Sequence, residues 1–262
     1  MEKETNFQTS LLKHIDDFRS VLETSNGDWT VKGFIDVFKN IYTISIDTKV
    51  ISKIIELMLF PALERFAKDN SFIMEFSKEQ NHYPDITFIT KDKEKIALDL
   101  KSSYRTKTGG VSGFTLGAFT GYFRDRKSNK NITYPYDNYT KHYILGVIYS
   151  KNIEKIDERK VYNLNNFEKI KSVVKKFDFI VQEKYRIAAD RPGSGNTKNI
   201  SSCNKIADLK NGNGVFSQLG VKIFDDYWIN YMTKEMAKTA ELSRPPYSNI
   251  KQYLNYRNIK NV

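Results

Sequence analysis

Residues 84–101 read PDITFITKDKEKIALDLK, and this stretch decides the fold. Two apolar runs are separated by a polar turn at 91–94, a pattern that predicts a β-hairpin. Asp85 begins the first run, while Asp99 and Lys101 lie late in the second. Side chains at positions i and i+2 of a strand share a face. Antiparallel pairing about the turn therefore predicts that the two aspartates and the lysine converge on one spot.

This set of side chains suits the metal-dependent hydrolysis of a phosphodiester. Mg²⁺ prefers oxygen ligands and takes one or two carboxylates, leaving positions for water and phosphate. A nearby cation can hold an attacking water or offset negative charge that develops on phosphorus. The alternative is structural, an aspartate in a turn and an Asp–Lys pair on a solvated strand face, because such faces are common. The predicted convergence favours the functional interpretation.

Composition places the chain in the soluble globular class. Its 262 residues suffice for one large domain or two small ones, and 40% of them are hydrophobic and 28% charged. No apolar run approaches the roughly 20 residues that span a bilayer, and the N-terminus does not resemble a signal peptide. Cys203 is the single cysteine, which excludes an intrachain disulfide and a CxxC metal site. We therefore expect a cytoplasmic protein with no membrane partner.

The charge is strongly basic. The formal net charge is +11 and the sequence pI is about 9.4, which is typical of proteins that bind nucleic acid. A basic protein from an AT-rich genome, rich in Lys and Asn, is the alternative explanation. The 17 Phe and 16 Tyr residues can stack on bases, although most of them are expected in the core.

Periodicity predicts strands interleaved with helices. A helix is expected over 6–24, and a β-ribbon over 34–38 and 41–44, although its first part also fits a helix. Asp47 is expected to cap a helix over 48–68 that bends at Pro61. The remaining predicted elements are strands at 72–76, 86–89, 95–103, 143–149, 161–164 and 177–189, helices at 116–124, 225–236 and 248–257, and a loop at 191–199. This order argues for a mixed-sheet α/β or α+β fold.

The motif residues also carry a family resemblance. The run Asn81-His82-Tyr83-Pro84-Asp85, followed by Asp99-Leu100-Lys101, resembles the PD-(D/E)xK nucleases, and among them the EcoRV-type type II restriction endonucleases. The likeness extends from about residue 30 to about residue 235. It also includes Asp47-Thr48-Lys49-Val50 with Glu56-Leu57, Phe114-Thr115-Leu116-Gly117, Tyr134-Pro135 with Asp137 and Tyr139, and Gly193-Ser194-Gly195-Asn196-Thr197.

The resemblance implies a restriction-endonuclease-like fold with a central five-stranded mixed sheet flanked by helices. It implies a single nuclease domain over 1–262 that acts as a homodimer on double-stranded DNA. The implied parts are a dimerisation ribbon at about 30–45, a catalytic core at 49–190, a DNA-recognition loop at 191–199 and C-terminal helices at 220–262.

The resemblance also implies residue roles. Asp85 and Asp99 would hold Mg²⁺, with Mn²⁺ as a substitute, and Lys101 would orient water or stabilise the transition state. Glu56 would bind metal or position its helix, and its alternative is an ordinary solvated glutamate. The implied DNA contacts are Gly193, Ser194, Gly195, Asn196, Thr197, Asn199, Gln80, Asn81, Lys49, Ser102, Ser103 and Thr115. Glycines allow close approach to bases, and Asn196 suits a bidentate contact to adenine.

The implied activity is hydrolysis of both strands at a short palindrome. The expected site is GATATC, cut bluntly at the centre to leave 5′-phosphates, with a central TA step that kinks at low cost. Lys198 and Glu79 depart from the pattern of the relatives, so salt dependence or specificity can shift. The host is expected to carry a separate cognate DNA methyltransferase.

Three alternative functions remain open. One is a structure-selective or repair nuclease on the same fold, against which the loop at 193–199 argues. Another is a catalytically inactive DNA-binding protein, against which the competent residues at every catalytic position argue. An RNA-binding module is the third, and the sequence lacks the aromatic motif of such modules.

Overall fold

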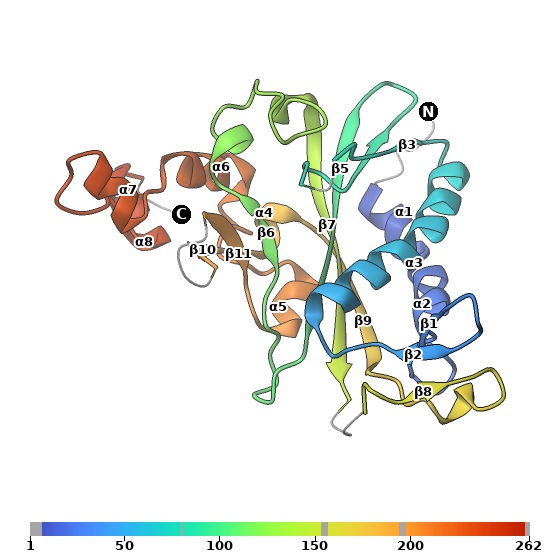
Figure 1. Ribbon diagram of the computed structural model, residues 1–262. Helices are drawn as coiled ribbons and strands as arrows, with labels where there is room; N and C mark the ends of the chain where they lie inside the picture. Colours follow the sequence, from blue (N-terminus) through green and yellow to red (C-terminus); the bar gives the residue numbers. More distant parts are fainter. Residues whose placement is uncertain (1–6, 80, 153–156, 194–197, 260–262) are drawn as a thin grey trace. The chain divides into compact units, whose positions relative to one another are not determined.

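The computed structural model describes residues 7–79, 81–152, 157–193 and 198–259 (Figure 1). Their contacts divide the chain into two compact units. The first unit is drawn from Met1–Ile73, Leu100–Ser112 and Leu145–Val181, and the second from Met74–Asp99, Gly113–Ile144 and Gln182–Val262. The single nuclease domain over 1–262 stays a prediction.

A five-stranded sheet has the strand order β3-β4-β5-β7-β9. The fold is mixed α/β, with helices flanking this mixed sheet, so the predicted fold class is confirmed. The strands are β3 (Ile73–Phe76), β4 (Ile86–Ile89), β5 (Lys95–Tyr104), β7 (Tyr139–Lys151) and β9 (Val174–Glu183). The predicted strand over 177–189 is wrong in one respect, because α4 (Lys184–Ile187) interrupts it before β10 (Ala188–Pro192).

Strands β4 and β5 form the predicted antiparallel hairpin. The paired residues are Ile86 with Leu98, Thr87 with Ala97, Phe88 with Ile96, and Ile89 with Lys95. The turn closes where the amide of Glu94 donates to the hydroxyl of Thr90, at 3.1 Å. Three consecutive β4 residues, including Thr87, are buried, so both faces of this strand are covered.

The first unit begins with two helices rather than the single helix predicted over 6–24. Helix α1 (Phe7–Lys13) ends before His14, and α2 (Ile15–Leu22) begins after it. The His14 ring Nδ1 bonds to the carbonyl of Ser10 at 3.0 Å, and the His14 amide donates instead to Leu11. In an unbroken α-helix the His14 amide donates to the Ser10 carbonyl. Here the His14 ring bonds to that carbonyl in place of the amide, and the helix ends at this point.

Helix α3 (Thr48–Asp69) is confirmed together with its cap. The Asp47 carboxylate accepts from the amides of Lys49 and Val50, at 2.8 and 3.1 Å, satisfying two donors that a helix N-terminus leaves open. The buried stripe of this helix consists of Ile51, Ile55, Leu59, Ala62, Leu63, Phe66 and Ala67. Phe66 packs edge-on against Phe7 of α1, with ring centroids 5.5 Å apart.

The predicted ribbon is confirmed as a small sheet in the same unit, so its helical alternative is wrong. Strand β1 (Gly33–Ile35) pairs antiparallel with β2 (Ile41–Thr43), and β2 pairs with β8 (Val161–Tyr162). The β1–β2 turn is closed by the Asp36 carboxylate, which accepts from the amides of Phe38 and Asn40, both at 2.9 Å.

The second unit contains a sheet of order β10-β11-β6, with β6 at Thr115–Ala118 and β11 at Asn199–Ser202. The helix predicted over 116–124 is wrong: β6 occupies its first part, and a 3-10 turn over Gly121–Phe123 follows. Gly117 has φ +92°, a left-handed conformation that a helix cannot contain, and pairing with β11 holds this segment extended.

Four helices complete the second unit: α5 (Ile206–Asn211), α6 (Gly220–Asn230), α7 (Lys234–Thr239) and α8 (Ile250–Tyr256). The helix predicted over 225–236 is wrong in its extent, because Thr233 starts α7 as a new helix by accepting from the amide of Met236. Helix α8 confirms the helix predicted over 248–257. Two further 3-10 turns lie at Tyr136–Asn138 in this unit and Phe167–Lys169 in the first. Across the described residues, no helix combines the length and apolar character needed to cross a membrane.

Candidate active site

The structure brings Asp85 and Asp99 together at the open end of the β4–β5 hairpin. Extending the hairpin register by one residue sets them opposite each other. The Asp85 amide donates to Oδ1 of Asp99 at 3.3 Å. The Asp99 side chain is buried, with 3% of the residue exposed, whereas Asp85 is partly exposed. One carboxylate is thus held rigidly in the protein and the other faces a more open environment.

Backbone contacts fix the segment that carries Asp85. The amide of Ser77 donates to the Asp85 carbonyl at 3.1 Å, and the amide of Tyr83 donates to the carbonyl of Asn131 at 3.1 Å. The amide of Thr133 donates in turn to the Tyr83 carbonyl at 2.8 Å. Because the chain is anchored on both sides of Pro84, the Asp85 side chain leaves a fixed backbone position.

The two aspartates fit a divalent cation. Two neighbouring carboxylates, one of them buried, favour a bound cation because like charges destabilise each other away from water. Among the described residues, no three or more His, Cys, Asp or Glu side chains form a metal-binding group. A hard cation that uses two carboxylates and completes its shell with water and phosphate matches this donor set.

Lys101 and Glu56 belong to the first unit, whereas the two aspartates belong to the second. Lys101 follows Asp99 by two positions on β5, and its Nζ donates to the carbonyl of Leu100 at 3.2 Å. Glu56 accepts from Nζ of Lys53 at 2.6 Å on the surface of α3. The meeting of Lys101 and Glu56 with the aspartate pair stays a prediction.

The predicted recognition loop begins and ends on a β-hairpin. Strand β10 leads into Gly193, whose amide donates to the carbonyl of Asn199 at 3.1 Å. Arg191, Pro192 and Asn199, placed in the loop by the sequence, are strand residues. Four predicted contacts in the loop, Ser194, Gly195, Asn196 and Thr197, lie outside the described residues, as does Gln80.

The other predicted DNA contacts differ in exposure. Asn81, Lys49 and Thr115 are exposed. Ser102 is partly exposed, and its Oγ shares a hydrogen bond with Oγ of Ser52 on α3, at 2.7 Å. Ser103 is only 4% exposed, so its side chain offers little surface to a phosphate.

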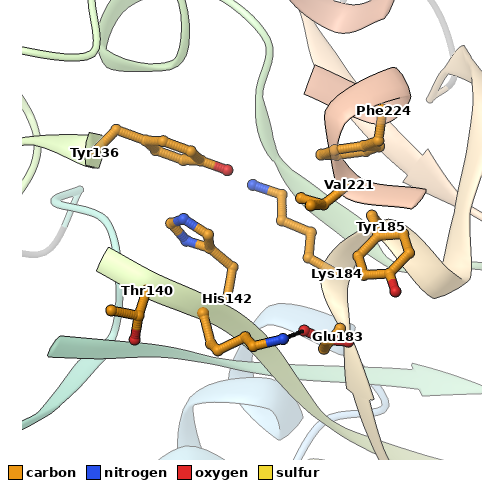
Figure 2. A pocket seen from close by; sticks show the side chains of 9 residues that line it. Tyr136, Thr140, His142, Glu183, Lys184, Tyr185, Val221 and Phe224 are labelled. Carbon is orange, nitrogen blue, oxygen red and sulfur yellow. Dashed lines mark hydrogen bonds and ion pairs between the residues drawn. The ribbon is translucent and has the colours of Figure 1, made fainter. Parts of the chain in front are cut away.

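A cluster behind Asp85 was not predicted from the sequence. The Tyr83 hydroxyl and Nδ1 of His142 share a hydrogen bond at 2.7 Å, and the His142 ring stacks on Tyr136 with centroids 4.1 Å apart. Lys184 is 1% exposed beside them. Figure 2 shows the end of the Lys184 side chain directed towards Tyr136, in the wall of a cavity of about 90 Å³.

The cluster shifts the pKa of its members. Burial lowers the pKa of His142 well below its usual value, and the charges of Lys184 and Arg126 lower it further, so the ring is neutral near pH 7. Burial, followed by nearby Tyr136 and the Asp99 charge, raises the pKa of Tyr83 well above its usual value. The available sequence signals were a histidine directly before the strand predicted over 143–149 and a lysine within the strand predicted over 177–189. Polar residues in or beside buried strands are informative.

The hairpin of a mixed α/β fold carries two paired aspartates within the motif Pro84-Asp85 and Asp99-Leu100-Lys101. This combination defines the class of PD-(D/E)xK nucleases. The family model described as restriction endonuclease EcoRV matches residues 25–258. The chain belongs to this family of site-specific deoxyribonucleases, so the resemblance inferred from the motifs is confirmed.

A relative and a solved structure show the extent of the similarity. The type II restriction enzyme EcoRV of Escherichia coli is 36% identical over 243 residues, covering 92% of this chain and 96% of that protein. A structure of the NlaIV restriction endonuclease covers 94% of both chains at 12% identity, with a TM-score of 0.40. The second likeness is too weak to add to the assignment.

Proposed function

We propose that this protein is a Mg²⁺-dependent type II restriction endonuclease that cuts both strands of duplex DNA at GATATC. The cut falls bluntly at the centre and leaves 5′-phosphates. The observation that carries the proposal is the juxtaposition of Asp85 and Asp99 on one hairpin, in a chain of the EcoRV family. The run Gly193-Ser194-Gly195-Asn196-Thr197, shared with EcoRV-type enzymes, supports the choice of site.

Asp85 and Asp99 hold the metal ion in this proposal, with Glu56 as a further ligand or a support for its helix. A bound divalent ion polarises a phosphate oxygen and lowers the pKa of water. Lys101 orients the attacking water or offsets the charge that develops on phosphorus. Mn²⁺ substitutes for Mg²⁺ because it accepts the same oxygen ligands.

DNA binding rests on the loop and on the basic charge of the chain. The loop at 193–197, with Asn199, reads base edges, and Asn196 makes the bidentate contact to adenine. Gln80, Asn81, Lys49, Ser102 and Thr115 contact the backbone or the minor groove, whereas the buried Ser103 is left out of the proposed contacts. A net charge of +11 favours the phosphate backbone and makes affinity fall as salt rises.

The protein acts as a homodimer through the ribbon at about 30–45. Five large hydrophobic side chains on this ribbon are exposed: Phe34 by 54%, Ile35 by 55%, Val37 by 89%, Phe38 by 81% and Tyr42 by 39%. A group of exposed apolar side chains of this kind is typical of an interaction site, and a two-fold dimer matches a palindromic DNA site. The enzyme works in the bacterial cytoplasm beside a cognate methyltransferase that protects host DNA.

Digestion of a plasmid of known sequence, followed by sequencing of the fragment ends, tests this function. We expect discrete fragments that require Mg²⁺ and end bluntly within GATATC. A sequence-independent smear rejects specificity, and preference for branched DNA supports a structure-selective nuclease. DNA left intact with Mg²⁺ or Mn²⁺ supports an inactive DNA-binding protein.

Substitution of Asp99 tests the aspartate pair directly. We expect Asp99→Ala to reduce the cleavage rate by about a thousandfold or more, because a metal ligand is lost, while DNA binding persists. Asp92→Ala is the matched control, since Asp92 lies exposed in the turn of the same hairpin. Cleavage at the wild-type rate by Asp99→Ala rules out the proposed metal site.

A further inference from the structure

Lys184 stands at the start of the segment that leads into the recognition loop. It is the first residue of α4, which continues directly into β10 and then Gly193. With 1% of its surface exposed, it is among the most buried charged residues of the described chain. Neither the proposed metal site nor the proposed DNA contacts uses it.

The Lys184 ammonium is enclosed by aromatic rings of the second unit. Its Nζ lies 4.8 Å from the ring centroid of Tyr83, 5.5 Å from that of Phe123 and 5.9 Å from that of Tyr136. The electron-rich faces of such rings attract a cation, most strongly where water is excluded. Moving the ammonium away from Tyr83 is therefore unfavourable, and the two side chains are expected to shift together.

Tyr83 is close to Asp85 in the chain, because only Pro84 separates them. Its hydroxyl bonds to His142, and its backbone bonds on both sides, as described above. The ring is thus held at both ends, and Lys184 packs on its face. Lys184 therefore packs on an anchored ring whose residue lies two positions before Asp85.

The Lys184 ammonium also lies close to Gly117 of β6, a strand of the sheet that carries the loop. A Cβ added to Gly117 on β6 would lie 3.4 Å from Nζ of Lys184. Strand β6 pairs with β11, where Ala118 opposes Asn199 at the far end of the loop. Lys184 therefore lies near Gly117 of β6 and packs on the ring of Tyr83.

We propose that Lys184 is a positioning residue that couples α4 and β10, the segment leading into the recognition loop, to the segment carrying Asp85. DNA seated in the loop shifts β10, and the buried ammonium carries that shift to the Tyr83 ring and the metal aspartate. The inference rests on the proposed function, because it takes the loop as the reader of DNA and Asp85 as a metal ligand.

Hydrogen–deuterium exchange of the full chain, without DNA or metal, tests the coupling between Lys184 and the Asp85 segment. Lys184→Met removes the charge and keeps much of the volume, so we expect faster exchange in 81–88 as well as in 184–192. Lys184→Arg keeps a cation over the rings and restores the wild-type pattern. Lys141→Met is the matched control, because Lys141 lines the same cavity but is exposed and pairs with Glu183 at 2.7 Å.

The reciprocal substitution keeps the test decisive if Lys184→Met does not fold. Tyr83→Leu removes the ring face, and we expect it to raise exchange in 184–192, since coupling between two sites is mutual. Tyr83→Phe keeps the face and loses only the hydroxyl, so it leaves 184–192 protected. Unchanged exchange in 81–88 for folded Lys184→Met, or in 184–192 for Tyr83→Leu, overturns the inference.

Cleavage kinetics then separate positioning from a structural role. With Mg²⁺ and a GATATC duplex, we expect Lys184→Met to lower kcat by about tenfold to a hundredfold with little change in KM. Lys184→Arg recovers most of the rate and Lys141→Met retains it. A raised KM at unchanged kcat contradicts the inference. Absence of cutting by the wild type rejects the proposed function. The exchange experiment tests the coupling between Lys184 and the Asp85 segment independently of cleavage.

Discussion

His142 supports the segment that carries Asp85, although it is not one of the proposed metal ligands. Its ring lies between the Tyr83 hydroxyl and the Tyr136 face, and positive charges at Lys184 and Arg126 act on it. Burial and these charges lower its pKa, which keeps the ring neutral and available to the Tyr83 hydroxyl. The backing of the Asp85 segment therefore includes a histidine whose surroundings favour the neutral ring.

We predict that acid weakens the fold through His142. Its pKa is below 6.5 in the folded chain, so its contribution is complete above pH 6.5 and is lost as the pH falls towards the folded value. For one group, the free energy of unfolding can fall by about 1.4 kcal/mol per pH unit in this range. Thermal unfolding between pH 8 and pH 5 measures this effect in the wild type and in His142→Gln.

The wild type should lose stability more steeply than His142→Gln below pH 6.5. For each protein, the change in thermal midpoint is measured relative to its own value at pH 8. At that pH the His142 imidazole of the wild type is neutral in both the folded and the unfolded chain. Parallel curves for the two proteins would show that protonation of His142 does not limit stability.

At the scale of elements, local polar contacts decide where helices begin and end. Asp47 starts α3 by accepting two amide protons, and the His14 ring ends α1 by occupying the Ser10 carbonyl. The sequence predicted the first event because Asp is a strong capping residue. It did not predict the second, since a histidine in an apolar helical pattern carries no comparable signal.

We predict that Asp47→Ala lowers the stability of the fold by about 1 kcal/mol, because the amides of Lys49 and Val50 lose their acceptor. For a chain of this size, the thermal midpoint should fall by about 2–4 °C. Asp47→Ser is the control, since serine caps helices about as well. Equal midpoints for the alanine and serine variants would exclude a contribution from the cap.

At the scale of the molecule, the exposed apolar ribbon and the basic charge indicate partners. Val37 and Phe38 are more than four-fifths exposed in the single chain, which is unfavourable for large apolar side chains in water. The proposed homodimer covers them. The net charge of +11 serves a different partner, the DNA backbone.

We predict that Val37→Asp weakens dimerisation by about tenfold to a hundredfold. Placing a charge in an apolar interface forfeits the burial of one aliphatic side chain, worth about 1.5–3 kcal/mol. Sedimentation velocity over a range of protein concentrations measures the dissociation constant. Leu242→Asp is the control, because Leu242 is 43% exposed outside the ribbon. An unchanged constant for Val37→Asp would place the interface elsewhere.

The amino-acid sequence alone determined the hairpin register, the α3 cap, the ribbon and the family, because each depends on local patterning or on short motifs. Tertiary structure decided the rest. The segment at 115–118 became a strand because β11 pairs with it and Gly117 takes a left-handed conformation. The contact of Lys184 with Tyr83 joins residues that are distant in the chain, and no local pattern encodes which buried ring a lysine will meet.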